Sequence, residues 1–286
     1  ASREALEYWT PVDWYNGGME HTTLHLLYSR FWHKFLFDIG VVPTGEPYRK
    51  RTSHGLILGE NGEKMSKSRG NVVNPDEVVE QCGADAFRLY EMFMGAFDQP
   101  IPWSTQGLNG MNRFIHRVWD LQAKVSADAP EVKSVTQAVH QSVRKVSEDI
   151  EATKFNTAIA QLMTLSNVFG QAESVRTADF GVFVLLLAPF APHVAEELWE
   201  RLGHTGGLAR ENWPSWDDAL LAADEITMVV QVNGRRRGEF TAPAGIGRDE
   251  AESSARELPN VKRHLEGKTV RKVVVVPGKL VNIVAQ

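Results

Sequence analysis

The sequence is poor in cysteine and has no long apolar run. Among its 286 residues Cys82 is the one cysteine, so the chain cannot form an internal disulfide or a cysteine-based zinc site. No apolar stretch approaches the roughly 18 residues that cross a membrane, and no basic-then-apolar leader opens the chain. We expect a cytoplasmic protein with no membrane partner. Because the chain begins at Ala1 rather than Met, we also expect it to be part of something longer.

Positive charge is scarce except near the end of the chain. The formal net charge is -5. Residues 226–286 contain 11 Lys and Arg against 6 Asp and Glu, so this tail carries +5 and the rest carries -10. A small basic module on an acidic chain favours contact with a polyanion such as nucleic acid. Ordinary surface charge is the alternative explanation.

Hydrophobic periodicity predicts a largely helical chain. A short apolar strand at 55–59 is followed by a polar, lysine-rich loop at 60–74, and Asn74-Pro75 supplies a cap and a first-turn proline for the next helix. Residues 203–225 have the composition of a linker. The expected helices are 20–38, 75–83, 85–94, 107–124, 134–151, 154–171, 175–188 and 192–202, of which those from 107 onward form an antiparallel bundle.

The final 60 residues change character. Asn233-Gly234 predicts a tight turn between two strands, a helix is expected at 249–258, and two further strands flank Pro277-Gly278. The order ββαββ predicts a small α+β domain.

The segment Lys64-Met65-Ser66-Lys67-Ser68-Arg69-Gly70-Asn71 carries the sharpest chemical signal. Two lysines three residues apart on a flexible loop can close over a polyphosphate. Charge builds on pyrophosphate as it departs from an attacked α-phosphate, and cations that meet this charge lower the barrier. A solvated surface loop is the alternative, because runs of Lys and Ser are common.

KMSKS resembles the signature loop of the class I aminoacyl-tRNA synthetases, and its continuation GNVVNPDEVVEQCGADAFRLYEMF resembles the leucine, isoleucine, valine and methionine subgroup. Upstream, PVD, GGMEH and LHLLYSRFWHKFL look specifically like the leucyl family. FNTAIAQLMTLSN and LLLAPFAPHVAEELWERLG resemble the anticodon-binding-type bundle of the subgroup. VQVNGRRRG is similar to the C-terminal domain of bacterial leucyl enzymes.

The resemblance implies a multidomain protein of α and α/β class. Residues 1–74 would form the second half of a Rossmann-like, nucleotide-binding catalytic domain that carries the KMSKS loop. Residues 75–106 would form the stem-contact-fold helices. Residues 107–224 would form the helical anticodon-binding-type bundle with a linker, and residues 225–286 a C-terminal tRNA-binding α+β domain.

The resemblance also implies ATP-dependent activation of leucine and its transfer to tRNA(Leu), with Mg²⁺ arriving on ATP. Lys64 and Lys67 would be catalytic. Residues expected to bind ATP are Gly17, Gly18, Glu20, His21, His25, Ile57, Leu58, Lys64, Met65, Ser66, Lys67 and Ser68. Residues expected to bind tRNA are Arg235, Arg236, Arg237, Lys262, Arg263, Arg271 and Lys272.

Two histidine patterns suggest metal ligands, but we expect no metal site. His21 and His25 are four residues apart on the predicted helix, which is the spacing of a metal pair, but no third ligand accompanies them. His193 is more often a helix-start residue whose partner is backbone.

One motif of the class I enzymes is missing. No His-x-Gly-His (HIGH) sequence occurs, and neither the first half of the catalytic sheet nor an editing domain is present. We therefore expect a fragment or subunit of the enzyme that is inactive alone and pairs with an N-terminal half carrying HIGH and editing domains. The alternative is a non-catalytic tRNA-binding or assembly protein derived from that family.

Overall fold

The computed structural model describes residues 1–221, 225–243 and 245–286. Its packing divides the chain into two units, Ala1–Ser215 and Trp216–Gln286. Residues 222–224 of the linker predicted at 203–225 lie outside the described residues, whereas residue 225 already belongs to a strand of the second unit. Within the described ranges, no helix has the length and apolar character needed to cross a membrane.

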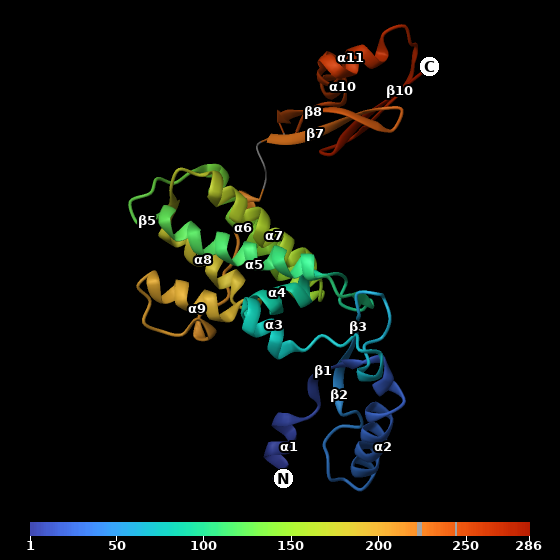
Figure 1. Cartoon of the computed structure of the whole chain (residues 1–286), viewed down its shortest axis with the longest axis vertical. Coiled ribbons are helices and arrows are strands. Elements are labelled where there is room, and N and C mark those ends of the chain that lie inside the picture. The colour runs from blue at the N-terminus through green and yellow to red at the C-terminus, as the bar shows by residue number, and fades with distance from the viewer. Residues whose placement is uncertain (222–224, 244) are drawn as a thin grey trace. The chain divides into compact units, whose positions relative to one another are not determined.

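The first unit opens with a short helix and a β-α-β element (Figure 1). The strands β1 (Val12–Gly18) and β2 (Tyr48–His54) are parallel and pair in register from Val12 with Tyr48 to Gly18 with His54. Parallel strands joined by a helix are the building unit of nucleotide-binding sheets. The other elements of this region are α1 (Arg3–Trp9), the 3₁₀ turn η1 (Met19–Thr22) and α2 (His25–Asp38).

The predicted helix at 20–38 was wrong in its first turn. Residues Met19–Thr22 form the separate 3₁₀ turn η1, and α2 begins at His25. Leu24, with φ -114° and ψ -105°, interrupts the helical backbone between them. Two successive threonines, whose β-branched side chains are poor helix formers, precede this break.

A pair of two-residue strands links the signature loop to the helices. β3 (Ile57–Leu58) lies parallel to β4 (Ile101–Pro102). The loop follows β3 and contains the 3₁₀ turn η2 (Lys67–Arg69). The next helices are α3 (Pro75–Cys82), which Asn74 caps as predicted, and α4 (Ala84–Phe93). The expected order of strand, loop and capped helix is therefore present.

The helical bundle supplies the largest core of the first unit. Fully buried side chains from four of its helices, such as Phe114, Ile159, Phe183 and Leu198, pack together. Its elements are α5 (Thr105–Asp120), η3 (Leu121–Lys124), β5 (Val125–Ser126), α6 (Lys133–Glu151), α7 (Phe155–Gln171), β6 (Val175–Arg176), α8 (Thr177–Leu187), α9 (Pro192–Arg201) and η4 (Leu208–Arg210).

The second unit is a four-stranded sheet in the order β8-β7-β10-β9, in which β10 is parallel to β7. Two helices pack on one face, around Met228, Val261 and Ile283. The predicted ββαββ order missed the second of these helices. Pro259 does not end the first helix region; it occupies a first-turn position of the next one. The elements are η5 (Asp218–Leu220), β7 (Glu225–Val232), β8 (Arg235–Pro243), α10 (Arg248–Glu257), α11 (Pro259–Leu265), β9 (Val270–Val276) and β10 (Leu280–Ala285).

Candidate nucleotide site and tRNA-contacting surface

The end of β1 forms a glycine turn whose next residues fold back over it. Gly17 and Gly18 end the strand opposite Ser53 and His54 of β2. A Cβ atom on Gly18 would lie 2.3 Å from a carboxylate oxygen of Glu20, so this carboxylate rests directly against the turn. A side chain at Gly18 would therefore displace Glu20, so the turn requires glycine there.

Aromatic rings surround the two histidines that follow the turn. The hydroxyl of Tyr15 lies 2.8 Å from Nδ1 of His25, and the two rings stack at 5.4 Å. Burial, followed by the neighbouring phenols of Tyr48 and Tyr28, raises the pKa of Tyr15. Tyr15 therefore stays a neutral phenol and shares a hydrogen bond with His25, whose tautomer sets the donor.

His21 lies at right angles to His25, with ring centroids 6.5 Å apart. The two are not on one helix face, because His21 belongs to η1 and His25 to α2. The Nδ1 atom of His21 is buried without a hydrogen-bond partner in the described ranges. An unsatisfied ring nitrogen of this kind can accept or donate a hydrogen bond to a bound heteroaromatic group.

A closed turn at the end of β3 leads into the signature loop, residues 64–68. Leu58 forms a β-bridge with Lys64, and the amide of Gly59 donates to the carbonyl of Glu63. The chain thus reverses between residues 59 and 63, and the expected ATP residues Ile57 and Leu58 form its outgoing strand. Beyond it, the hydroxyls of Ser66 and Ser68 lie 2.7 Å apart.

Both lysines of the loop extend into solvent. Lys64 and Lys67 are exposed, whereas Met65 between them packs against the bundle core. Neither lysine has a hydrogen bond or ion pair from its ammonium group within the described parts of the chain. Two unpaired ammonium groups on one loop can meet two phosphates of a bound polyphosphate.

The predicted ATP residues form two groups, residues 17–25 after β1 and residues 57–68 around the signature loop, and β2 lies between them along the chain. Gly17, Gly18, Glu20, His21 and His25 lie together at the carboxyl end of β1. His54, paired with Gly18, is three residues before β3, which leads into the loop. No hydrogen bond or ion pair among the described residues joins residues 17–25 directly to residues 64–68.

Many apolar side chains of α1, β1 and α2 are exposed. Apart from Pro47, only Leu26 and Val42 are buried apolar side chains in residues 1–54, all of which the structure describes. Phe31 of α2 is 75% exposed. Other exposed apolar side chains here are Tyr8, Trp9, Val12, Trp14, Leu24, Leu27, Tyr28, Trp32 and Phe35. Apolar patches of this size mark an interface.

The predicted tRNA residues fall into two groups in the second unit. Arg235, Arg236 and Arg237 lie on β8, an edge strand, and Asn260 of α11 donates to the carbonyl of Arg237 at 2.8 Å. Lys262 and Arg263, which also lie on α11, are therefore near the β8 edge of the sheet. Arg271 and Lys272 lie on β9, which is the opposite edge of the sheet.

The arginine triplet is not uniformly free. Arg236 pairs with Glu239 at 2.6 Å. Arg237 is half-buried, and its Nε atom is buried without a partner in the described residues. Arg235 is exposed and has no ion pair within the described ranges. On α11, Lys262 pairs with Glu257 at 2.6 Å.

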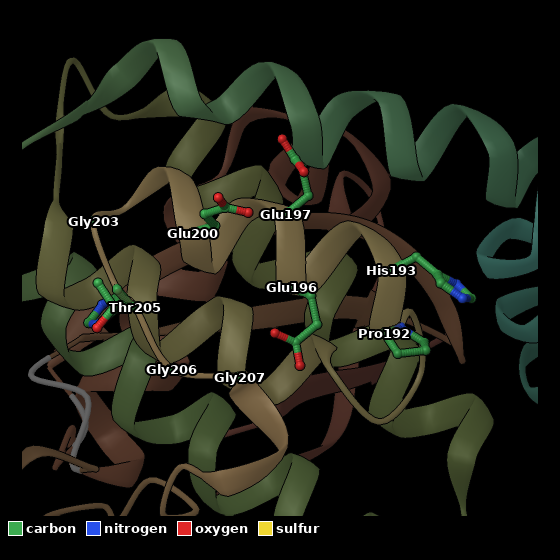
Figure 2. A pocket seen from close by; sticks show the side chains of 10 residues that line it. Pro192, His193, Glu196, Glu197, Glu200, Gly203, Thr205, Gly206 and Gly207 are labelled. Atoms are coloured by element: carbon green, nitrogen blue, oxygen red, sulfur yellow. The ribbon is translucent and has the colours of Figure 1, made fainter.

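A hollow of about 940 Å³ lies along α9 in the first unit and is lined by acidic side chains. Figure 2 shows Glu196, Glu197 and Glu200 projecting from the helix and the glycine segment at residues 203–207 beside them. The Glu196 carboxylate accepts a hydrogen bond from the amide of Leu208 at 3.0 Å, which holds that segment. Glu197 is paired with Arg201, and the carboxylates of Glu196 and Glu200 remain to repel phosphate, so we assign no phosphate-binding role to this hollow.

Two family models match the chain. Residues 2–100 match the tRNA synthetases class I (I, L, M and V), and residues 133–250 match the anticodon-binding domain of tRNA ligase. Over its whole length the chain is 50% identical to a leucine–tRNA ligase of Alkaliphilus oremlandii (strain OhILAs), of which it covers 36%. The chain belongs to the leucyl-tRNA synthetase family.

A solved leucyl-tRNA synthetase has a similar structure. The AgnB2 LeuRS of Agrobacterium radiobacter K84, crystallised in a ternary complex with tRNA and LeuAMS, matches with a TM-score of 0.72 and 34% identity. The similarity covers 97% of this chain and 38% of that one. The chain thus spans little more than a third of the length of the leucyl-tRNA synthetases it matches.

The contacts of two polar residues in the chain were not predicted from the sequence. Asn71 bonds to the backbone of the signature loop at two points. Asp85 of α4 meets His193 of α9, 108 residues away. The position of Asn71 directly after the loop was a usable signal, whereas nothing local marks the pairing of Asp85 with His193.

Proposed function

We propose that this chain supplies the signature-loop half of the catalytic domain, together with tRNA-contacting parts, of a leucyl-tRNA synthetase. The complete enzyme would activate leucine with ATP and transfer it to tRNA(Leu). The observation that carries the proposal is the signature loop after β3, whose backbone is bonded to Asn71 and whose two lysines are exposed and make no ion pair within the described residues. In this view, residues 1–74, 75–106, 107–224 and 225–286 are the catalytic half, the stem-contact helices, the bundle with its linker, and the tRNA-binding domain.

Lys64 and Lys67 would act on the departing pyrophosphate. Their ammonium groups are exposed and unpaired in the described residues, so no existing ion pair has to break before they meet phosphate. Since charge on the β- and γ-phosphates increases as the bond to the α-phosphate breaks, these lysines would stabilise the transition state more than bound ATP.

The glycine turn would hold the adenosine of ATP. Gly17 and Gly18 allow the ribose to approach the backbone, Glu20 can accept from its hydroxyls, and the unsatisfied Nδ1 of His21 can bond to a polar group of the nucleotide. His25, fixed by Tyr15, would line the same side. Mg²⁺ would enter bound to ATP and neutralise phosphate charge.

The bare apolar face of α2 would be covered by the other half of the catalytic domain. Phe31, Leu27 and Trp32, at 75%, 66% and 59% exposure, present large apolar side chains to water. The matched relatives are nearly three times as long as this chain, so they contain the residues to cover it. An N-terminal half that carries the HIGH motif is the occupant we propose, and the chain alone would not activate leucine.

The second unit would contact tRNA through backbone phosphates. Its exposed cations, Arg235 above all, lie at a hairpin edge rather than on a surface shaped to read bases. Phosphate contacts of this kind give affinity without sequence discrimination.

Leucine-dependent ATP–pyrophosphate exchange tests the proposal. We expect no exchange by the chain alone, and exchange when the N-terminal half of the Alkaliphilus relative is supplied. In the reconstituted enzyme, Lys67→Ala should slow exchange by about 10²–10³-fold and change the Kd of ATP much less. Exchange by the chain alone would contradict the incomplete site. A stable complex of the two halves without exchange would instead favour a non-catalytic tRNA-binding or assembly protein.

A further inference from the structure

We propose that Asn71 is a positioning residue that holds the signature loop in the shape that presents Lys64 and Lys67. Its side-chain amide makes two hydrogen bonds to the loop backbone. Nδ2 donates to the carbonyl of Lys64 at 3.3 Å, and Oδ1 accepts from the amide of Ser66 at 2.9 Å. We call these two hydrogen bonds the tie. Its consequence for catalysis rests on the proposed function, whereas the existence of the tie does not.

The tie requires an amide side chain. The two bonds use one donor and one acceptor, and they fall on either side of Met65. Aspartate offers oxygens only, so it could keep the bond from Ser66 but would place a carboxylate against the Lys64 carbonyl. Alanine would lose both bonds. Comparison of the two substitutions therefore distinguishes the bond to Lys64 from the bond to Ser66.

The side-chain ion pair of the loop is a weaker constraint on its shape, and the backbone bridge between Leu58 and Lys64 fixes only the start of the loop. Arg69 pairs with Glu63 at 3.2 Å, but both side chains are more than half exposed, and such surface pairs hold a loop weakly. Asn71 is half-buried, and its bond from the Ser66 amide is partly buried, whereas its bond to the Lys64 carbonyl is exposed. The lack of a side chain at Gly59 makes room for it, because a Cβ there would lie 2.9 Å from Nδ2 of Asn71.

Packing fixes the loop on one side only. Met65 contacts the bundle core, so it anchors the residue between the two bonds. Behind the loop, a cleft of about 550 Å³ lies between residues 70–74 and α3 and has Asn71 in its wall. With open space there, the amide of Asn71 rather than contact with α3 determines how residues 64–68 turn. Rotation about this segment would redirect the ammonium groups of Lys64 and Lys67.

Amide hydrogen exchange tests the tie in the full chain as it stands. The amide of Ser66 should be protected in the unmodified chain and should exchange roughly ten-fold faster in Asn71→Ala, because its acceptor is gone. In Asn71→Asp the same amide should stay protected. Trypsin adds a second measurement: cleavage after Lys64 and Lys67 should rise by a similar factor in Asn71→Ala, since cleavage follows the population of the open loop.

Asn74→Ala is the matched control. Asn74 lies three residues further on, caps α3 through the amide of Asp76 and bonds to Glu77, and within the described residues its side chain makes no hydrogen bond to residues 64–68. Exchange at Ser66 and cleavage in the loop should stay as in the unmodified chain. Equal acceleration in Asn74→Ala would trace the effect to fraying of α3 and overturn the proposal, as would an unprotected Ser66 amide before any substitution.

In the enzyme reconstituted with its N-terminal half, Asn71→Ala should lower kcat for pyrophosphate exchange by roughly ten-fold and leave the KM for ATP nearly unchanged, and Asn71→Asp should recover part of the loss. A loosened loop with unchanged kcat would overturn the positioning role. Absence of pyrophosphate exchange in the unmodified reconstituted enzyme would instead count against the proposed function. The amide hydrogen exchange and trypsin results would still decide whether Asn71 holds the loop.

Discussion

The carboxylate of Asp85 joins α4 to the start of α9. One oxygen lies 2.8 Å from Nδ1 of His193, and the other accepts from the amide of Val194 at 2.7 Å. Arg88, one turn further along α4, donates to the carbonyls of Pro189 and Phe190. Two charged residues of one helix therefore bind both sides of the turn between α8 and α9. Through α4, this turn is connected to the segment that follows the signature loop.

Replacement of Asp85 by alanine should destabilise the first unit by about 2–4 kcal/mol. Asp85 is buried, and its loss leaves the amide of Val194 at the helix start without its acceptor. His193→Ala is the control. This imidazole is 74% exposed, so its removal should cost no more than about 0.5 kcal/mol. Urea unfolding followed by helical circular dichroism measures both, and equal losses would show that the His193 contact, not the cap, stabilises the joint.

Gly55→Ala should disrupt the root of the signature loop. A Cβ atom at this position would lie 1.9 Å from the carbonyl oxygen of Gln99, which is backbone and cannot swing aside. The parallel pairing of β3 with β4 would have to separate, with a loss of about 3 kcal/mol or more. Thermal unfolding and amide exchange at Ile101 and Trp103, which donate to Leu56 and Leu58, report this change.

Gly170→Ala is the matched substitution for Gly55→Ala. Gly170 lies inside α7, and a Cβ there would meet nothing within 4 Å. Alanine favours the helix over glycine, so the variant should be as stable as the unmodified chain or up to about 1 kcal/mol more stable. A stable Gly55→Ala variant with unchanged exchange would disprove the close approach of the two segments.

Local signals in the sequence predicted the elements around the site, but not the contacts between them. Asn74-Pro75 as a helix start and Asn233-Gly234 as a hairpin turn were confirmed because cap and turn preferences act over a few residues. The helix at Pro259 was missed because a proline is compatible with either an end or a start. The expected backbone partner of His193 was wrong, because a carboxylate 108 residues away in the sequence takes that role.

The Glu46 carboxylate should titrate far below its usual range. Hydrogen bonds from Arg30 and then Lys34 lower its pKa from 4.5 to about 2. A depressed pKa in the folded state means that the interaction stabilises the fold fully above pH 4.5 and is lost as the pH falls toward 2. Carbon-detected NMR titration measures the value, and Arg30→Gln should move it back toward 4.5. Because these groups are exposed, 1 M salt should reduce the shift, and a pKa near 4.5 in the unmodified chain would refute the pairing.

The second unit should bind tRNA through Arg235 more than through its two neighbours. Arg236 is engaged by Glu239, and Arg237 is half-buried, so Arg235 is the member of the triplet most able to neutralise a phosphate. Arg235→Ala should weaken binding and flatten the dependence of log K on log salt by about 0.9, the value for one phosphate contact on a duplex. Glu239→Gln should have the opposite effect, since it releases Arg236 to make a second contact.

Arg256→Gln provides the comparison, because this arginine lies on α10 and makes two bonds to Glu252 within its own helix. Its substitution removes the same charge from the same unit, so long-range attraction to RNA falls equally, but no phosphate contact is lost. The salt slope should therefore match that of the unmodified chain. Titration of the four proteins with tRNA at several salt concentrations separates these outcomes. If Arg235→Ala and Arg256→Gln weaken binding alike and leave the slope alike, the hairpin edge contributes only net charge, and the phosphate contacts lie elsewhere.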